Sequence, residues 1–199
     1  MRRKKFSDRA KPITPRTVRG LAVALAVLWT CVIGVVLFLS YRSEMTGAEQ
    51  AATIAARAQF RQDIVYRRWN ANLGGVYAEV SEQLKPNPYL ADHEERDIVT
   101  PSGRRLTLIN PAFMTRGVHE LALRSEGIRG HITSLDPIRP ENAADAWESA
   151  ALAGFEEEND EFFQVQELGG EKYLRLMRPL VTEESCLQCH GDQGYKVGE

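Results

Sequence analysis

The stretch Cys186-Leu187-Gln188-Cys189-His190 has two thiols and an imidazole at the spacing of a c-type haem attachment site. The two intervening residues let both sulfurs reach one edge of a porphyrin, where each can bond one vinyl group. The imidazole that follows is placed to turn back toward the iron. We therefore expect one covalent haem c, attached at Cys186 and Cys189, with His190 as the proximal iron ligand.

Three other interpretations of these cysteines have less support: a disulfide, a thioredoxin-like redox pair, and half of a zinc site. Zinc takes four ligands, usually with a second Cys or His pair, and the only other cysteine, Cys31, lies in an apolar run. A redox pair normally opens a helix after a strand, whereas this pair is followed by glycines. These glycines are Gly191, Gly194 and Gly198.

The N-terminal segment has the pattern of a basic tail followed by a membrane anchor. Residues 1–20 carry eight basic side chains and one acid, Asp8, and residues 21–41 carry no charge. At about 1.5 Å per residue, a helix over that run is roughly 31 Å long, close to the hydrocarbon thickness of a bilayer. A cleaved signal peptide would have a shorter apolar region ending at small residues, whereas this run continues through Leu37 and Phe38. We expect an uncleaved, single-pass transmembrane helix.

The basic tail predicts on which side of the membrane the remainder of the chain lies, and the charge of that remainder bears on its partners. The basic tail is expected to stay cytoplasmic, so that the haem motif lies in the periplasm, beyond a bacterial inner membrane. Without the tail's eight basic and one acidic side chains, the 25 basic and 27 acidic residues of the chain fall to 17 and 26. This net charge near −9 argues against nucleic acid as a partner.

Residues 42–86 are predicted to form one membrane-proximal helix that continues from the anchor. No proline occurs between Glu44 and Leu84, and six apolar residues recur there at helical spacing. Such a stripe would lie on the domain core or pair with a second copy in a homodimer. Gly74-Gly75 interrupts the stripe, so we expect a haem edge or a crossing helix to approach there, with a simple kink as the alternative. The stripe consists of Val65, Trp69, Leu73, Val76, Val80 and Leu84.

Residues 87–199 are predicted to form an α+β haem c domain. Asn110-Pro111 provides a capping residue followed by proline at the first position of a helix. Gly169-Gly170 is a two-residue hairpin turn between two strand patterns. One antiparallel sheet with flanking helices on one face would make the domain PAS-like. The expected elements are a loop at 92–97, strands at 105–109, 130–135, 162–168 and 172–180, and helices at 111–125 and 143–158.

The motif does not fix the second axial ligand of the iron. Met114 and His119 share a predicted helix but are five residues apart, about 140° around its axis, so they cannot both face the iron. Met114 is the first candidate, because Val118 and Leu121 lie on its face, and His119 is the second. Water, an open site or a ligand from another subunit are the alternatives. The candidates weighed are Met114, His119, His131, His93 and Met177.

The sequence from Phe60 to Gly198 resembles a family of periplasmic c-type haem sensor domains with a PAS-like fold. Domains of this kind form the N-terminal part of bacterial sensor histidine kinases, diguanylate cyclases and chemoreceptors. Several separate blocks match in the same order along the chain. They are Arg67-Arg68-Trp69-Asn70 with Gly74-Gly75-Val76-Tyr77, Asn87-Pro88-Tyr89-Leu90, Asn110 to Arg116, Ser134 to Pro137 with Pro140-Glu141-Asn142, Arg178-Pro179-Leu180, and Cys186 to Gly191 followed by Gly194 to Gly198.

The resemblance implies covalent haem at Cys186 and Cys189, iron ligation by His190, and a role in reporting redox state or a small ligand across the membrane. Similar proteins continue into a second membrane helix and an output domain, whereas this sequence stops at Glu199. We therefore expect a non-enzymatic sensor module that acts on a separate signalling or redox partner. The alternative is an anchored electron-transfer cytochrome c or a haem subunit of a membrane redox complex. A haem peroxidase would need a distal acid–base pair, and no residue is singled out for that role.

Overall fold

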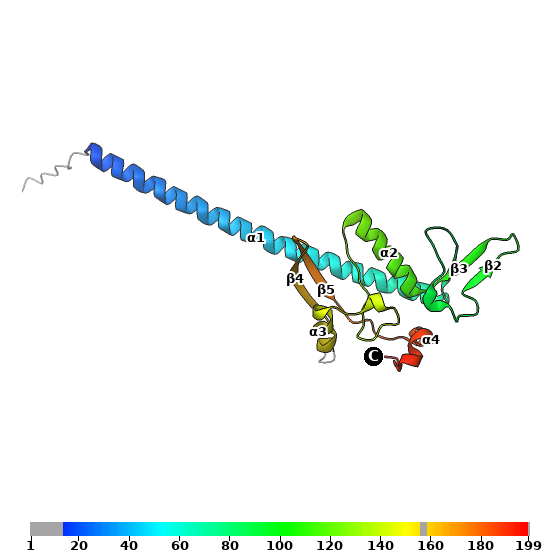
Figure 1. Ribbon diagram of the computed structural model, residues 1–199. Coiled ribbons are helices and arrows are strands. Elements are labelled where there is room, and N and C mark those ends of the chain that lie inside the picture. The colour runs from blue at the N-terminus through cyan, green and yellow to red at the C-terminus, as the bar shows by residue number, and fades with distance from the viewer. Residues whose placement is uncertain (1–13, 156–158, 199) are drawn as a thin grey trace, which may run out of the picture. The chain divides into compact units, whose positions relative to one another are not determined.

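The computed structural model describes residues 14–155 and 159–198, and the chain divides into two compact units after Ala51. Most of the expected basic tail and residues 156–158 of the expected helix 143–158 lie outside the described residues. The first unit contains the N-terminal part of helix α1. The second contains the rest of α1 and the other helices and strands (Figure 1).

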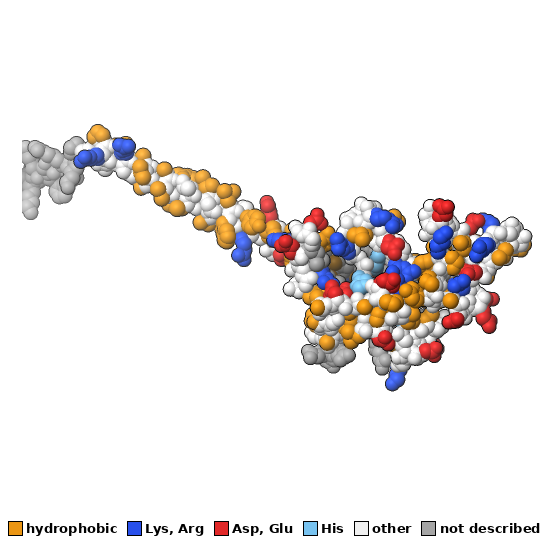
Figure 2. Space-filling view, viewed as in Figure 1, with side chains coloured by type: hydrophobic (Ala, Val, Ile, Leu, Met, Phe, Trp, Pro, Cys, Tyr) orange, Lys and Arg blue, Asp and Glu red, His pale blue; other side chains and the backbone are white. Residues whose placement is uncertain are grey.

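Helix α1 (Pro15–Asn72) begins at a threonine–proline pair. The Thr17 N–H donates to Oγ1 of Thr14 over 3.3 Å, and Pro15 takes the first helical position, where an N–H would have no partner. The predicted anchor 21–41 lies wholly within α1, and its apolar side chains are exposed along the helix (Figure 2). By length and composition this helix could cross a membrane, which is compatible with single-pass anchoring.

Helix α1 ends at Asn72, so the prediction of a helix over 42–86 is wrong in its last part. Gly74 and Gly75 have φ values of 72° and 96°, the left-handed conformation that glycine adopts at helix ends. The Gly75 N–H donates to the carbonyl of Asn70 over 2.9 Å, which satisfies one of the last carbonyls of the helix.

The segment that approaches Gly75 is the strand that contains Leu108, whereas a Cβ on Gly74 would meet no atom within 4 Å. The approach of a haem edge to these glycines stays a prediction. A Cβ placed on Gly75 would lie 2.6 Å from Cδ1 of Leu108 and 3.3 Å from the carbonyl oxygen of Ile109. Val76, the next residue of the predicted stripe, begins a strand. The stripe was misleading because residues four apart share a face in a strand as well as in a helix.

Three strands form an antiparallel sheet in the order β1-β3-β2. The central strand β3 (Arg105–Ile109) was predicted over the same residues and contains the buried Leu108. Strand β1 (Val76–Glu79) lies where a helix was expected, and β2 (Asp97–Val99) begins where a loop was expected. The register pairs Val76 with Ile109, Tyr77 with Leu108, and Asp97 with Thr107.

The predicted hairpin is confirmed as a separate, two-stranded sheet. Strand β4 (Phe162–Leu168) pairs antiparallel with β5 (Glu171–Met177), and Gly169 and Gly170 between them have φ values of 65° and 84°. Two left-handed residues in succession are the signature of a tight hairpin turn. The five strands of the described residues therefore form two small sheets, and the expectation of one antiparallel sheet is wrong.

Residues 130–135 do not form the expected strand. They contribute one isolated parallel bridge, from Ser134 to Ala143. The carbonyl of Asn142 accepts from Oγ1 of Thr133 at 2.8 Å and from the Ser134 N–H at 3.3 Å. This segment therefore bonds to the short 3₁₀ turn Pro140–Asn142 instead of to a strand edge.

Helix α2 (Pro111–Glu126) confirms the prediction of a helix over 111–125. Oδ1 of Asn110 accepts a hydrogen bond from the N–H of Phe113 over 2.9 Å, so Asn110 caps the helix as the sequence predicts. Gly127, with φ of 70°, ends the helix in the left-handed conformation.

Helix α3 (Ala146–Phe155) begins later than its predicted start at residue 143. Asp145 and Glu148 form a reciprocal cap, in which each carboxylate accepts the backbone N–H of the other residue at 2.8–2.9 Å. This cap fixes the start of the helix. Three further elements are short: the 3₁₀ turn Glu184–Cys186, helix α4 (Leu187–His190) and the 3₁₀ turn Gly191–Gln193.

Within the second unit, polar contacts, more than an apolar core, hold the other elements against the C-terminal part of α1. Nε2 of His119 on α2 lies 2.8 Å from Oδ2 of Asp63 on α1, so the two helices run side by side (Figure 1). Arg57 makes a two-pronged ion pair with Glu161, just before β4. The buried hydrophobic residues of the described chain are Leu90, Leu108 and Ala151.

Gly75→Ala should destabilise the second unit more than Gly74→Ala. Both residues have positive φ, which costs an L-residue roughly 1–2 kcal/mol. Only at position 75 does the added methyl meet Leu108, whereas at 74 it meets no atom within 4 Å. Thermal unfolding of the detergent-solubilised chain, followed by circular dichroism, measures both. Equal losses in the two variants would contradict the close approach of β3.

Candidate functional site

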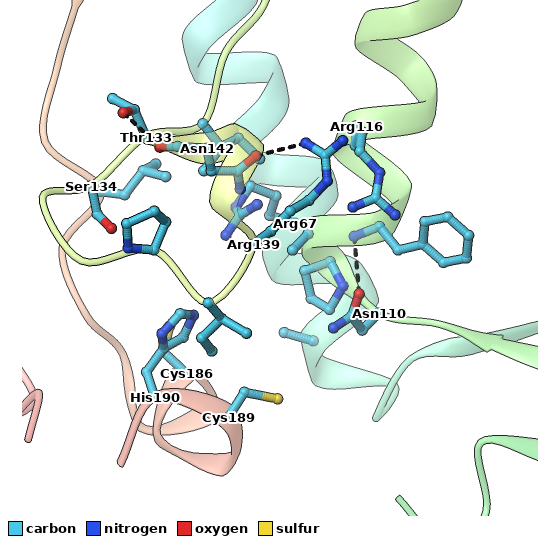
Figure 3. A pocket seen from close by; sticks show the side chains of 18 of the residues that line it. Arg67, Asn110, Arg116, Thr133, Ser134, Arg139, Asn142, Cys186, Cys189 and His190 are labelled. Carbon is cyan, nitrogen blue, oxygen red and sulfur yellow. Dashed lines mark hydrogen bonds between the residues drawn. The ribbon is translucent and has the colours of Figure 1, made fainter. Parts of the chain in front are cut away.

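A cavity of about 650 Å³ lies in the second unit and is lined by segments far apart in the sequence. Its volume falls within the range of about 300–1,000 Å³ common for small-molecule and cofactor sites. The walls come from the last turns of α1, most of the length of α2, residues 87–90, 129–142 and 180–190, and Tyr195 (Figure 3).

The cysteines and histidine of the predicted attachment site lie together on one wall. Cys186 ends the 3₁₀ turn that precedes α4, and Cys189 and His190 lie on α4 itself. Both thiols are free, and all three side chains line the cavity. The backbone N–H of Glu183 donates to Sγ of Cys186 over 3.4 Å, which fixes the start of this turn.

The His190 ring is held by a side chain that the sequence analysis did not single out. Its Nδ1 lies 2.6 Å from Oε1 of Gln193, and Nε2 of Gln193 donates to the carbonyl of Asp136 over 2.9 Å. Because that amide nitrogen is used as a donor, its oxygen faces the ring and Nδ1 carries the proton. Nε2 of His190 is then the unprotonated nitrogen, the form in which histidine binds a metal. Tyr195 packs edge-on against the ring at 5.7 Å.

Three of the five arginines that line the cavity gather on the side away from the cysteines. They are Arg67 on α1, Arg116 on α2, and Arg139 before the turn Pro140–Asn142 (Figure 3). Burial lowers the pKa of the Arg67 guanidinium, and burial followed by the like charge of Arg139 lowers the pKa of Arg116. Nη1 of Arg139 donates to Oδ1 of Asn142 over 2.9 Å.

Apolar side chains line much of the remaining surface between these two sides. A haem needs an apolar slot, two thiols at one edge and an unprotonated imidazole above its plane. The cavity combines a thiol pair, the Nε2 of His190 and an apolar lining, so its residues fit a covalently attached haem. The apolar residues include Ile64, Leu90, Leu123, Ile132, Ile138, Leu180 and Val181.

Two of the five candidates for the second axial ligand line the cavity, and both are engaged by protein groups. His119 bonds Asp63 through Nε2, and both side chains are largely buried, at 14% and 17% exposure. His131 places Nδ1 2.9 Å from Oε1 of Glu148 and Nε2 3.2 Å from the carbonyl of Glu141. Both ring nitrogens of His131 are therefore occupied in this structure.

The other predicted site residues lie away from this surface. Met114, the first candidate for the distal ligand, is half-buried on α2 but is not part of the cavity lining. The same holds for His93 and Met177, and for Gly74 and Gly75, of which Gly75 lies close to β3. Cys31 lies in the first unit and is not among the residues that line the cavity.

Sequence reasoning missed Gln193 and the three arginines as site residues. Gln193 could have been found, because a residue three positions after a ligating histidine, on the same turn, is within reach of its second nitrogen. The arginines come from three separated segments, and only the fold brings them together.

Comparison with known proteins identifies the family. No curated protein and no solved structure matches the chain significantly. A family model described as Tll0287-like matches residues 42–198, which includes all the residues that line the cavity. This match indicates a c-type haem domain, in agreement with the predicted cofactor. The chain belongs to the Tll0287-like family.

Proposed function

We propose that the chain is a membrane-anchored haem c protein that reports the state of its haem through α1, as a redox or small-ligand sensor module. Cys186 and Cys189 would hold the haem covalently, and Nε2 of His190 would face the iron. When bound, haem c supplies one-electron redox chemistry and a coordination position for a small ligand. The chain's own residues orient the group, exclude water and connect it to α1.

One ion pair carries the proposal, because it joins α1 to the attachment site. Nε of Arg68 on α1 donates to Oε1 of Glu183 over 3.1 Å, and this hydrogen bond, followed by the charge of Arg68, lowers the pKa of the Glu183 carboxyl. The backbone N–H of Glu183 in turn contacts the sulfur of Cys186. Two contacts therefore connect the haem attachment site to α1, so that a movement at the site can reach the helix.

Two further contacts join the same part of α1 to α2. Asp63 pairs with His119, and Nη1 of Arg67 lies 3.5 Å from Oγ1 of Thr115. A change of oxidation state or of an iron ligand that favours one arrangement of these walls would shift the population of α1 positions.

The location that we propose follows from the charge pattern of the N-terminus. The basic tail would lie in the cytoplasm, α1 would cross the inner membrane once, and the haem domain would be periplasmic. The readout would pass to a separate signalling or redox protein. Membership of the PAS-like fold stays a prediction.

The alternative function is electron transfer by an anchored cytochrome, and one observation favours it. Cys189 on α4 is exposed, and so are two apolar residues that flank α4 in the sequence, Val181 and Val197, at 58% and 60%. An apolar surface beside the haem edge would suit brief docking of a redox partner.

We also propose a homodimer formed through α1. Val65 and Trp69, both members of the predicted stripe, are 60% and 55% exposed, so the stripe does not cover the core of its own domain. Both residues lie on one side of the helix, where a second copy could bury them.

The attachment prediction is tested by replacing the two thiols. The variant Cys186→Ala/Cys189→Ala should lose all haem that survives denaturing electrophoresis, because the vinyl groups then have no sulfur to bond. Cys31→Ala is the matched control and should keep the full haem signal. The measurement is haem-dependent peroxidase staining of the gel, and haem retained by the double variant would contradict the assignment.

The sensor proposal predicts that the conformation of α1 depends on the redox state. Amide hydrogen exchange over residues 64–72 should differ between oxidised and reduced protein, and Arg68→Gln should reduce that difference at least severalfold. Arg61→Gln, an exposed arginine on the same helix, is the control. The charge swap Arg68→Glu/Glu183→Arg should restore part of the difference. Identical exchange in both redox states of the unaltered chain would favour the electron-transfer alternative.

The dimer proposal predicts that Val65→Ser/Trp69→Ser converts a dimer into a monomer, because the paired surface loses its apolar area. Val99→Ser, at a residue that is 68% exposed on β2, is the control and should leave the dimer intact. Light scattering of the purified chain in detergent gives the mass. A monomeric unaltered chain would contradict the proposal.

A further inference from the structure

Three of the five arginines that line the cavity, Arg67, Arg116 and Arg139, form a cluster of positive charge that the described carboxylates only partly offset. Arg139 pairs with Glu141 at 3.3 Å. Arg67 and Arg116 have no ion pair within 4 Å among the described residues, although both are partly buried. Arg116 rests on the ring of Phe113, 4.8 Å from its centre.

The nearest acidic groups are engaged elsewhere or lie farther away. Asp63 attracts Arg67 but bonds His119, and Glu183 bonds Arg68. Glu120 and Glu141 attract Arg116, and neither forms an ion pair with it. Partly buried guanidinium groups without a carboxylate are costly, so this surface favours an anionic ligand.

The arginines lie on the side of the cavity where the propionates of an attached haem would lie. In Figure 3 the arginines gather between α1, α2 and the turn Pro140–Asn142, across the cavity from Cys186, Cys189 and His190. The thiols bond the vinyl edge of a haem, and its two propionate carboxylates project from the opposite edge. Guanidinium groups bind carboxylates with two parallel hydrogen bonds.

We propose that Arg67, Arg116 and Arg139 form a carboxylate-binding site for the two propionates of the haem, an inference that rests on the proposed function. Neighbouring residues of α1 would then hold both edges of the group. Arg68 holds the thiol edge through Glu183, and Arg67 holds the propionate edge directly. A free dicarboxylate has the same chemistry, so the experiment must distinguish the two sources.

The experiment compares full-length chains that carry Arg67→Gln, Arg116→Gln or the control Arg61→Gln. The haem is labelled with ¹³C at its propionate carboxyls, through labelled 5-aminolevulinate in the growth medium, and redox-difference infrared spectra are recorded. The labelled carboxylate bands should shift in the first two variants and stay unchanged in Arg61→Gln. Unshifted bands in both site variants would overturn the assignment.

The midpoint potential provides a second readout. Loss of a positive charge beside the haem favours the oxidised iron, so Arg67→Gln and Arg116→Gln should lower the potential by a threefold to tenfold change in the redox ratio, about 30–59 mV. Arg67→Lys keeps the charge but loses the two-pronged geometry, so it should move the carboxylate bands with little change in potential. An unchanged potential in both glutamine variants would also contradict the proposal.

Succinate distinguishes the two sources of carboxylate. If propionates fill the site, succinate should not raise the Tm of the haem-loaded chain. A rise that disappears in Arg67→Gln would assign the arginines to a free dicarboxylate and overturn the propionate assignment. Covalent haem in the unaltered chain is checked first by gel staining, and its absence would overturn the proposed function separately from the infrared result.

Discussion

The polar face of α1 between Arg57 and Asn70 is the constraint on which the second unit depends. Asn70 is fully buried, and its side-chain amide donates to the carbonyl of Ile109 over 3.0 Å, which ties the end of the helix to β3. Farther back along α1, Asp63 holds α2, and Arg57 holds the entry to the hairpin. Because few apolar side chains are buried, these directional contacts set where each element lies.

The second unit contains a cavity where a larger apolar core would be expected. A domain of this size normally buries a contiguous apolar core, whereas here the apolar side chains face a cavity of about 650 Å³. A bound haem would complete that core and stabilise the folded state by mass action and by its covalent link. The same side chains would then serve stability and function, since whatever alters the haem also alters the packing around α1.

Features set by local chemistry could be predicted from the sequence. The N-terminal cap of α2 and the glycine hairpin each depend on residues within a few positions of one another, and each was found where expected. The end of α1 was missed because a spacing of four suits both a helix and a strand, and only the contact with Leu108 decides between them. The arginine cluster was missed because Arg67, Arg116 and Arg139 are brought together by tertiary structure alone.

The order of the cavity walls along the chain has a consequence for biogenesis. Synthesis proceeds from the N-terminus, so α1, α2 and residues 129–142 emerge before the cysteines. Most of the cavity can therefore assemble while the thiols are still being made, and the attachment segment is the last wall to arrive. Haem ligation would then act as a closing step, which seals a nearly finished compartment instead of nucleating it.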